Sequence, residues 1–171
     1  MSGEASSRVP GVPAPVDSEA VRIVPFAPEY AAAFKALNLA WITEHWEPEP
    51  SDSASLDQPQ HYIIGRGGHI TLAMLGDRIV GTCALIPMDD GGCELAKMSV
   101  AASARGKGIG RLLGETVIEK ARKLGAPRVY LESNTVLAPA IALYRKLGFR
   151  PVDGSPSPYQ RCNIQMELRL D

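Results

Sequence analysis

The sequence has few of the features that mark secreted, membrane or metal-binding proteins. Only three of its 171 residues are cysteines, and no two of them form a Cys-x-x-Cys pair. An odd number of free thiols is typical of a reducing compartment, so we expect a cytoplasmic protein. No apolar run approaches the roughly 20 residues that cross a bilayer. The histidines His45, His61 and His69 lack the spacing of metal ligands, so we expect neither a metal nor a membrane partner.

An excess of charge of one sign is also missing. The chain has 18 Lys and Arg residues against 19 Asp and Glu residues, and its formal net charge is −1. This balance gives no global electrostatic reason to bind nucleic acid or an anionic membrane. With 45% apolar and 22% charged residues, the composition is that of a soluble globular protein. A phosphate-binding function would therefore require a local basic cluster.

The first 20 residues differ from the rest of the chain. They are rich in Ser, Gly and Pro and carry no periodic pattern. They also lack the apolar core of a secretory signal and the basic excess of a transit peptide. We expect a flexible N-terminal lead-in over residues 1–20 and a single domain over residues 21–171.

Hydrophobic periodicity and turn residues divide this domain into strands and helices. Three prolines between Trp46 and Gln60 predict a loop there, with one helical turn around residues 53–56. Three helices are predicted. The first begins at Glu29, and the other two cover residues 108–124 and 139–147. The predicted strands cover 21–24, 70–75, 79–88, 93–100, 128–132, 149–152 and 161–170. Strand and helix alternate in the C-terminal half, which is the pattern of crossover units in an α/β sheet.

A glycine-rich basic segment, Arg-Gly-Lys-Gly-Ile-Gly at residues 105–110, separates a predicted strand from the long helix. Glycines let the backbone approach an anion closely, and the first N–H groups of a helix are unpaired and point outward. Residues 105–124 hold six basic and two acidic side chains, a local charge of +4 in a chain of net charge −1. The segment is predicted to bind phosphate.

Two common nucleotide motifs do not fit this segment. A dinucleotide-binding GxGxxG that begins at Gly106 would need glycine at position 111, which is Arg111. A P-loop needs Ser or Thr after its lysine, but Gly108 follows Lys107. A dinucleotide-dependent oxidoreductase is therefore a disfavoured alternative. The segment instead matches RxxGxG, with Arg105, Gly108 and Gly110 at the fixed positions.

This pattern resembles motif A of the GNAT superfamily, the acyl-CoA-dependent N-acyltransferases. Four further features agree with the resemblance, which covers roughly residues 20–170. Glu94 lies eleven residues before Arg105, where several members keep a catalytic glutamate. Residues 94–100 are similar to the fourth strand of the family, residues 140–149 to its LYxxxGF helix, and residues 163–168 to its last strand.

The resemblance implies an α/β fold with a mixed, mostly antiparallel sheet of about seven strands and about four helices, splayed at the central parallel strands. It also implies that acetyl-CoA is the co-substrate. The family asparagine seven residues before the tyrosine is Leu137 here, so its cofactor contact is assigned to Asn134. Dimers are frequent among the relatives, which leaves a homodimer open. The implied coenzyme A contacts are Met98, Ser99, Val100, Arg105, Gly106, Lys107, Gly108, Ile109, Gly110, Arg111 and Asn134.

Acetyl transfer to a primary amine needs a base, because an amine of pKa ~10 is almost entirely protonated at neutral pH. Glu94 is the best candidate, acting directly or through a water, and Tyr144 is the natural acid for the leaving thiolate. Direct attack requires no covalent enzyme intermediate. Glu94 would otherwise be a solvated strand residue and Tyr144 a core aromatic. In that case the protein would be a non-catalytic acyl-CoA-binding or sensing module.

The amine acceptor is not encoded in any motif. The resemblance assigns its site to the first helices and the final hairpin, roughly residues 29–62 and 153–162. Trp41 fits the core stripe of the first helix, and Trp46 at the end of that helix is a candidate for lining a substrate mouth.

Overall fold

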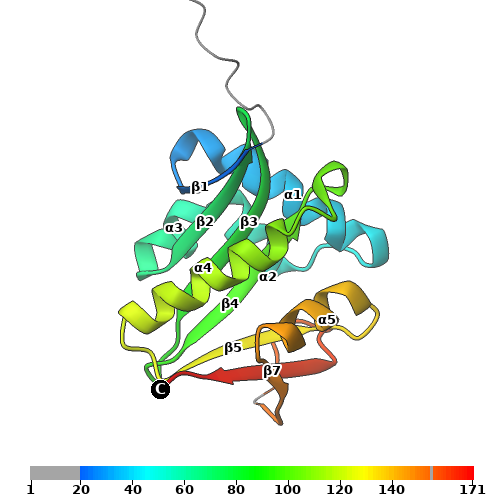
Figure 1. The fold of residues 1–171 in the computed structure, drawn as a ribbon. Coiled ribbons are helices and arrows are strands. Elements are labelled where there is room, and N and C mark those ends of the chain that lie inside the picture. Colours follow the sequence, from blue (N-terminus) through cyan, green and yellow to red (C-terminus); the bar gives the residue numbers. More distant parts are fainter. Residues whose placement is uncertain (1–19, 155) are drawn as a thin grey trace, which may run out of the picture.

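A seven-stranded sheet in the order β1-β2-β3-β4-β5-β7-β6 is the frame of the computed structural model, which describes residues 20–154 and 156–171 (Figure 1). Only β4 and β5 run parallel, and every other neighbouring pair is antiparallel. The predicted mixed sheet is confirmed, while residues 1–19 of the predicted lead-in lie outside the described residues. The strands are β1 Val21–Pro25, β2 His69–Leu75, β3 Arg78–Pro87, β4 Cys93–Val100, β5 Arg128–Ser133, β6 Arg150–Pro151 and β7 Ile164–Arg169.

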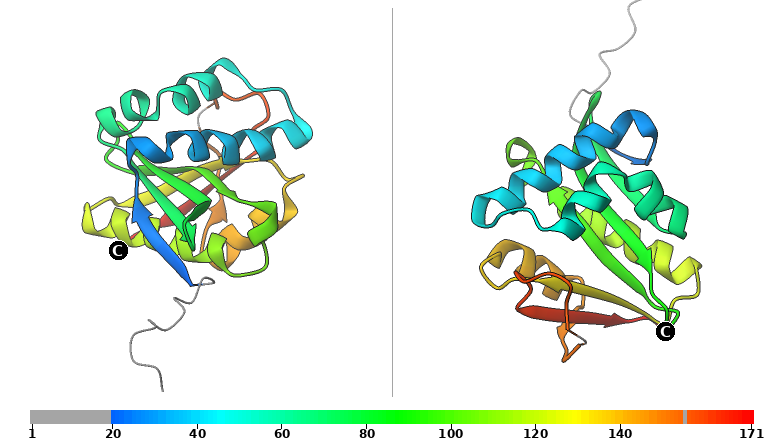
Figure 2. Two further views of the ribbon diagram at one scale, coloured as in Figure 1. Left: turned by 90° about the horizontal axis from the view of Figure 1, so that it is seen from above. Right: turned by 180° about the vertical axis from the view of Figure 1, so that it is seen from behind.

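Helices cover both faces of this sheet (Figure 2). The helices α1 to α3 pack on one face, and α4 and α5 pack on the other. No helix in the described part of the chain is long and apolar enough to cross a membrane. The described α-helices are α1 Ala31–His45, α2 Pro50–Asp57, α3 Pro59–Tyr62, α4 Ile109–Lys123 and α5 Ala138–Lys146, and short 3₁₀ turns are η1 Pro28–Tyr30, η2 Ile64–Arg66 and η3 Ala102–Ala104.

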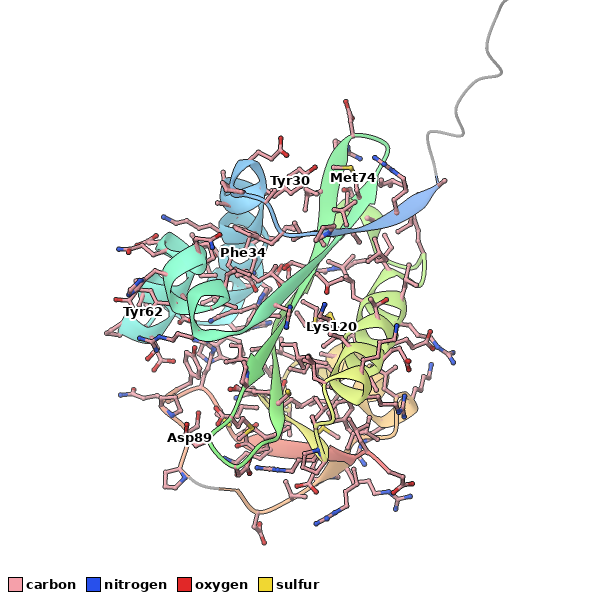
Figure 3. The ribbon with its side chains drawn as sticks, turned by 90° about the vertical axis from the view of Figure 1, so that its left-hand side faces the viewer. Tyr30, Phe34, Tyr62, Met74, Asp89 and Lys120 are labelled. Atoms are coloured by element: carbon pink, nitrogen blue, oxygen red, sulfur yellow. The ribbon has the colours of Figure 1, made fainter. Side chains whose placement is uncertain are left out.

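Each face of the sheet has its own apolar core. In Figure 3, Phe34 lies between α1 and the sheet, and Lys120 lies on α4 on the opposite side. In the first core, the helices α1, α2 and α3 pack on strands β2 and β3. Its buried residues are Phe34, Ile42, Leu56, Ile63, Ile70, Leu72 and Ala84. The second joins α4 and α5 to the strands, and its largest side chains include Leu85, Ile109, Leu113, Leu131, Phe149 and Met166.

The loop predicted between Trp46 and Gln60 is wrong. Helices α2 and α3 occupy most of this segment, and each begins with a proline, Pro50 and Pro59. Proline suits the first position of a helix, because the N–H that it lacks has no partner there. The prolines therefore start helices instead of interrupting them. The two closing strands are also shorter than predicted.

The sheet opens between its two parallel strands. β4 pairs with β5 only at Cys93↔Val129 and Glu94↔Tyr130, and beyond these residues the strands diverge (Figure 1). The predicted splay is confirmed. The backbone groups of β4 that face β5 therefore have no ladder partner after Glu94.

A bulge lies in the opened part of β4. On its other edge, Thr82 of β3 pairs with Ser99 and Ala84 pairs with Ala96, so that Lys97 and Met98 both face Cys83. Lys97 has a φ of 53°, and no other non-glycine residue of the described chain has a positive φ. A bulge redirects the side chains around it. Here it brings the buried Lys97 to the opening of the sheet.

Candidate active site

The opening between β4 and β5 contains a cavity of about 420 Å³. Its walls come from the C-terminal end of α1, from β4 and β5, from α5, from the start of α4 and from the loop before β7. Eight predicted site residues line it: Glu94, Met98, Ser99, Val100, Arg105, Gly110, Asn134 and Tyr144. Five others, Gly106, Lys107, Gly108, Ile109 and Arg111, belong to the adjoining loop and helix start and do not line the cavity.

The loop at the start of α4 has the geometry of an anion cradle. Gly106 and Gly108 have φ values of 79° and 75°, and a Cβ at either position would meet no protein atom within 4 Å. Gly108 is the N-cap of α4, and no side chain of the described residues caps this helix. The backbone is therefore accessible where the N–H groups of the first turn need an acceptor.

The basic side chains of the cradle differ in how strongly they pair with protein carboxylates. Arg105 and Lys107 are exposed. The one ion pair of Arg105 among the described residues, with Glu44, is long at 3.9 Å and exposed to water. Arg111 donates a hydrogen bond of 2.8 Å to Glu115 one turn later on α4. Arg105 and Lys107 are thus the cations that an anion at the cradle would meet first.

Gly110 has a packing role that the motif alone does not reveal. A Cβ there would lie 3.2 Å from Cδ2 of Leu143, and a Cβ at Gly114 would lie 2.6 Å from Cδ1 of Leu147. These two glycines are one helical turn apart and let α5 approach α4 closely. Ile109 is likewise buried in the apolar core, so only its backbone faces the cradle.

Glu94 lies where β4 begins to separate from β5. Its carboxyl is largely removed from water, and this burial, together with the negative charge of Glu132, raises its pKa to about 7, against the opposing charge of Lys97. Glu132 itself accepts hydrogen bonds from the hydroxyls of Tyr130 and Ser157. A carboxyl of pKa about 7 can accept and release a proton near neutral pH.

Tyr144 lies on α5 across the cavity from β4. Its ring packs edge-on against Phe149, with ring centroids 6.0 Å apart. Its hydroxyl has no hydrogen-bond partner among the described residues, and burial raises its pKa well above the ordinary value. Tyr144 therefore keeps its proton at neutral pH and holds it beside the cavity.

Ser99 and Asn134 line the cavity but commit their side chains to other parts of the protein. The Ser99 hydroxyl donates to the carbonyl of Leu37 at 2.8 Å, which ties β4 to α1. The amide of Asn134 donates to the carbonyl of Arg161 at 2.7 Å and accepts from the N–H of Val136 at 2.9 Å. Because the Ser99 hydroxyl is engaged, only the backbone groups of Ser99 are available to a ligand. The cofactor contact of Asn134 stays a prediction.

A buried charge cluster forms the other side of the cavity, and no sequence motif indicated it. The carboxylate of Asp52, on α2, is wholly buried. It receives two hydrogen bonds of 2.7 Å from Arg161 and lies 3.4 Å from the ammonium of Lys97. Lys97 also donates to the hydroxyl of Tyr159 at 3.2 Å. The cluster thus joins α2, β4 and the loop before β7, and the predicted acceptor segments do meet here.

The ionisation of this cluster follows from its contacts. Burial alone would raise the pKa of Asp52. The hydrogen bonds from Arg161 and from the N–H of Glu49, with the charges of Lys97 and Arg161, lower it instead. For Lys97, burial lowers the pKa while Asp52 opposes the change. Burial and nearby carboxylates raise the pKa of Tyr159 to about 12.

Two tryptophans border this side of the cavity. Trp41 and Trp46 pack edge-to-face with centroids 6.4 Å apart, and Arg161 lies 5.4 Å from the Trp41 ring. Trp46 lines the cavity, and its role at a substrate mouth stays a prediction. Trp41 packs against the core on the α1 side of the sheet, as predicted, and its ring lines the cavity as well. The described residues contain no group of three or more His, Cys, Asp or Glu side chains that would hold a metal ion.

Comparison with known proteins agrees with this geometry. An acetyltransferase of the GNAT family from Staphylococcus aureus Mu50 superposes with a TM-score of 0.81 at 24% identity, over 89% of this chain and 100% of the other. The Salmonella typhimurium protein yncA, solved with acetyl-CoA, superposes with a TM-score of 0.71 at 19% identity, over 90% and 95% of the two chains.

Curated relatives match over shorter stretches. The uncharacterized N-acetyltransferase YjgM of Escherichia coli is 46% identical over 61 residues, which is 36% of each chain. N-acetylaspartate synthetase of Rattus norvegicus is 36% identical over 100 residues, 58% of this chain and 33% of the relative. The matched stretch thus spans about a third of these two relatives. Residues 32–149 match the family described as the acetyltransferase (GNAT) family, and the chain belongs to that family.

Proposed function

We propose that the protein transfers an acetyl group from acetyl-CoA to a primary amine, with Glu94 as general base and Tyr144 as general acid. The observation that carries the proposal is the placement of two groups on one cavity: a carboxyl of pKa about 7 and a phenol that keeps its proton. The names of the relatives, which are N-acetyltransferases, support nitrogen as the acceptor atom.

The residues around the cavity fit coenzyme A. The main chain from Gly106 to Gly110 offers N–H groups at an accessible, positively charged helix start for the pyrophosphate. Arg105 and Lys107 add charge there. The unpaired edge of β4 over Met98–Val100 offers backbone groups for the pantetheine arm and a backbone N–H that would polarise the thioester carbonyl.

The proposed chemistry is a direct displacement. Glu94 removes a proton from the ammonium, directly or through one water, and the neutral nitrogen bonds to the carbonyl carbon. The carbon–sulfur bond then breaks, and Tyr144 gives its proton to the departing sulfur. The nitrogen loses its second proton as the amide forms, which restores the Tyr144 phenol, and Glu94 releases the first proton to water. The products are an amide and free coenzyme A. No bond forms between the acetyl group and the protein.

A thiol-release assay tests this function against a non-catalytic acyl-CoA-binding module. Acetyl-CoA is incubated with the protein alone and then with a panel of primary amines, amino acids and peptides. We expect release that depends on the amine, with one acetylated amine formed for each thiol released. Calorimetric binding of acetyl-CoA without amine-dependent release would favour the binding module.

A further inference from the structure

The side of the cavity opposite the cradle presents hydrogen-bond donors that have no acceptor among the described residues. An ammonium has three protons, and Lys97 directs two of them to Asp52 and Tyr159. Because the hydroxyl of Tyr159 accepts from Lys97, its own proton is directed elsewhere. None of the hydrogen bonds described for Tyr159 uses that proton. Both side chains line the cavity.

These donors are fixed in place before any ligand arrives. Arg161 lies 4.5 Å from the centroid of the Tyr159 ring and is anchored by Asp52, and Lys97 lies 5.2 Å from the same centroid. Glu49 pairs with Arg161 at 3.2 Å and makes no ion pair with Lys97. Lys97 thus shares the buried carboxylate of Asp52 with Arg161, and Arg161 lies closer to that carboxylate than Lys97 does. Glu94 is the other carboxyl whose charge acts on Lys97, but no ion pair or hydrogen bond joins the two. A ligand acceptor beside Lys97 would therefore gain a charge-assisted hydrogen bond.

This donor pair lies beside the base. Lys97 is three residues after Glu94 on the same strand, and each charge affects the pKa of the other. An acceptor whose amine is at Glu94 therefore places its adjoining atoms next to Lys97 and Tyr159. An α-amino acid suits two neighbouring groups of this kind, because one carbon carries both its amine and its carboxylate. A second ammonium at the same place would be repelled by Lys97.

We infer that the acceptor is a free α-amino acid, whose carboxylate is bound by Lys97 and Tyr159 while its amine lies at Glu94. The inference rests on the proposed function and names its substrate class. The side chain of the amino acid extends toward Trp41 and Trp46, which border the same side of the cavity.

Matched acceptors test the inference. Several L-amino acids, methionine among them, are compared with their amides and with their decarboxylated amines, and spermidine represents polyamines. We expect kcat/KM for the preferred amino acid to exceed that for its amide by about tenfold or more. The amide lacks the negative charge that Lys97 would pair with, and its NH2 group replaces one of the two oxygens that would accept hydrogen bonds from Lys97 and Tyr159. Amides, simple amines or spermidine used equally well or better would overturn the inference and leave the proposed function intact.

Two variants locate the effect. Lys97→Met removes the charge at similar length, and Tyr159→Phe removes only the hydroxyl. Each is expected to lower the ratio of kcat/KM for the acid to that for the amide toward one, with the larger loss for Lys97→Met. Because a ratio cancels a general loss of activity, it stays informative if a variant is partly destabilised. An unchanged ratio in both variants overturns the inference. Thiol release with no acceptor at all overturns the inference and the proposed function together.

Discussion

The carboxylate of Asp52 receives two hydrogen bonds of 2.7 Å from the guanidinium of Arg161, a residue 109 positions later in the chain. The pair joins α2 to the loop before β7, so it fixes the two segments that form the acceptor side of the cavity. Asp52 is wholly buried and the side chain of Arg161 is 10% exposed, so water screens their attraction little. The geometry of the acceptor side therefore depends on this ion pair.

Replacing Asp52 by Asn should destabilise the fold strongly. The change removes the carboxylate that Lys97 pairs with and leaves Arg161 only its weaker contact with Glu49, and breaking a buried pair costs about 3–5 kcal/mol. The matched control is Asp57→Asn on the same helix. Asp57 pairs with Lys35 at 2.6 Å, but both side chains are about half exposed, so its loss should cost about 1 kcal/mol or less. Urea unfolding of the wild type and both variants at pH 7 measures the two costs, and equal costs would contradict the argument.

The same pair gives a pH dependence of definite sign. The pKa of Asp52 is lowered in the folded protein, so its carboxylate contributes stability that is complete above the unfolded value of about 4. That contribution is lost as the pH falls through the folded value. The difference in unfolding free energy between the wild type and Asp52→Asn should thus shrink below about pH 4. A difference that stays constant down to pH 3 would show that the charge of Asp52 is not its source.

Most of the fold could be predicted because it follows from patterns among residues close together in the sequence. The hairpin of β2 and β3, strand β4 and helix α4 follow from alternation, turn glycines and an apolar stripe, which are properties of neighbouring residues. Pro50 and Pro59 misled the prediction, since a proline at the first position of a helix has the same sequence signature as one that ends it.

The candidate site likewise has one part that the sequence predicts and one part that it does not. The cradle was predictable because it is contiguous in sequence. The cluster of Asp52, Lys97 and Arg161 was not, because its members are at least 45 positions apart and only the fold brings them together. The contact of Arg161 with the Trp41 ring was unpredictable for the same reason, because Arg161 comes from the other end of the chain.

Replacing Glu94 by Gln should reduce turnover by about 10² or more at neutral pH, because the shape is kept and the base is lost. In the wild type the base form of Glu94 is populated above its pKa of about 7, so kcat/KM should rise with pH through that value. The variant should lose this inflection and recover in part at high pH, where more of the amine is already neutral. A variant with the wild-type rate and pH profile would place the base elsewhere.

Glu132→Gln offers a matched test of the same titration. The negative charge of Glu132 helps to raise the pKa of Glu94. Glutamine keeps the shape and one acceptor oxygen, so it can accept from one of the hydroxyls of Tyr130 and Ser157 and donate its NH2 to the oxygen of the other. Removing the charge should lower the pKa of Glu94 and move the rise in kcat/KM to lower pH. Profiles of kcat/KM for the wild type and Glu132→Gln measure the shift, and a shift to higher pH would contradict this coupling.

Replacing Gly108 by Leu should abolish most coenzyme A binding and leave the fold intact. Gly108 has a φ of 75°, so a side chain costs about 1–2 kcal/mol of backbone strain and also projects into the open space of the cradle. Gly125→Leu is the matched control, since Gly125 lies at the other end of α4 with a φ of 76° and equally open surroundings. Thermal unfolding should show similar losses in both variants. Calorimetry should show at least a tenfold loss of affinity in Gly108→Leu only, and affinity within about twofold of wild type in a folded Gly108→Leu would refute the cradle.

Replacing Tyr144 by Phe should reduce kcat by about 10² or more with little change in the KM for acetyl-CoA. The ring keeps its edge-on contact with Phe149, whereas the proton for the departing sulfur is lost. Steady-state kinetics with each substrate varied in turn separate the alternatives. A role in acceptor binding would instead raise the KM of the amine and leave kcat nearly unchanged. If kcat and both KM values stayed at wild-type levels, Tyr144 would be only a core aromatic, because its hydroxyl would then serve neither the reaction nor a hydrogen bond with the described residues.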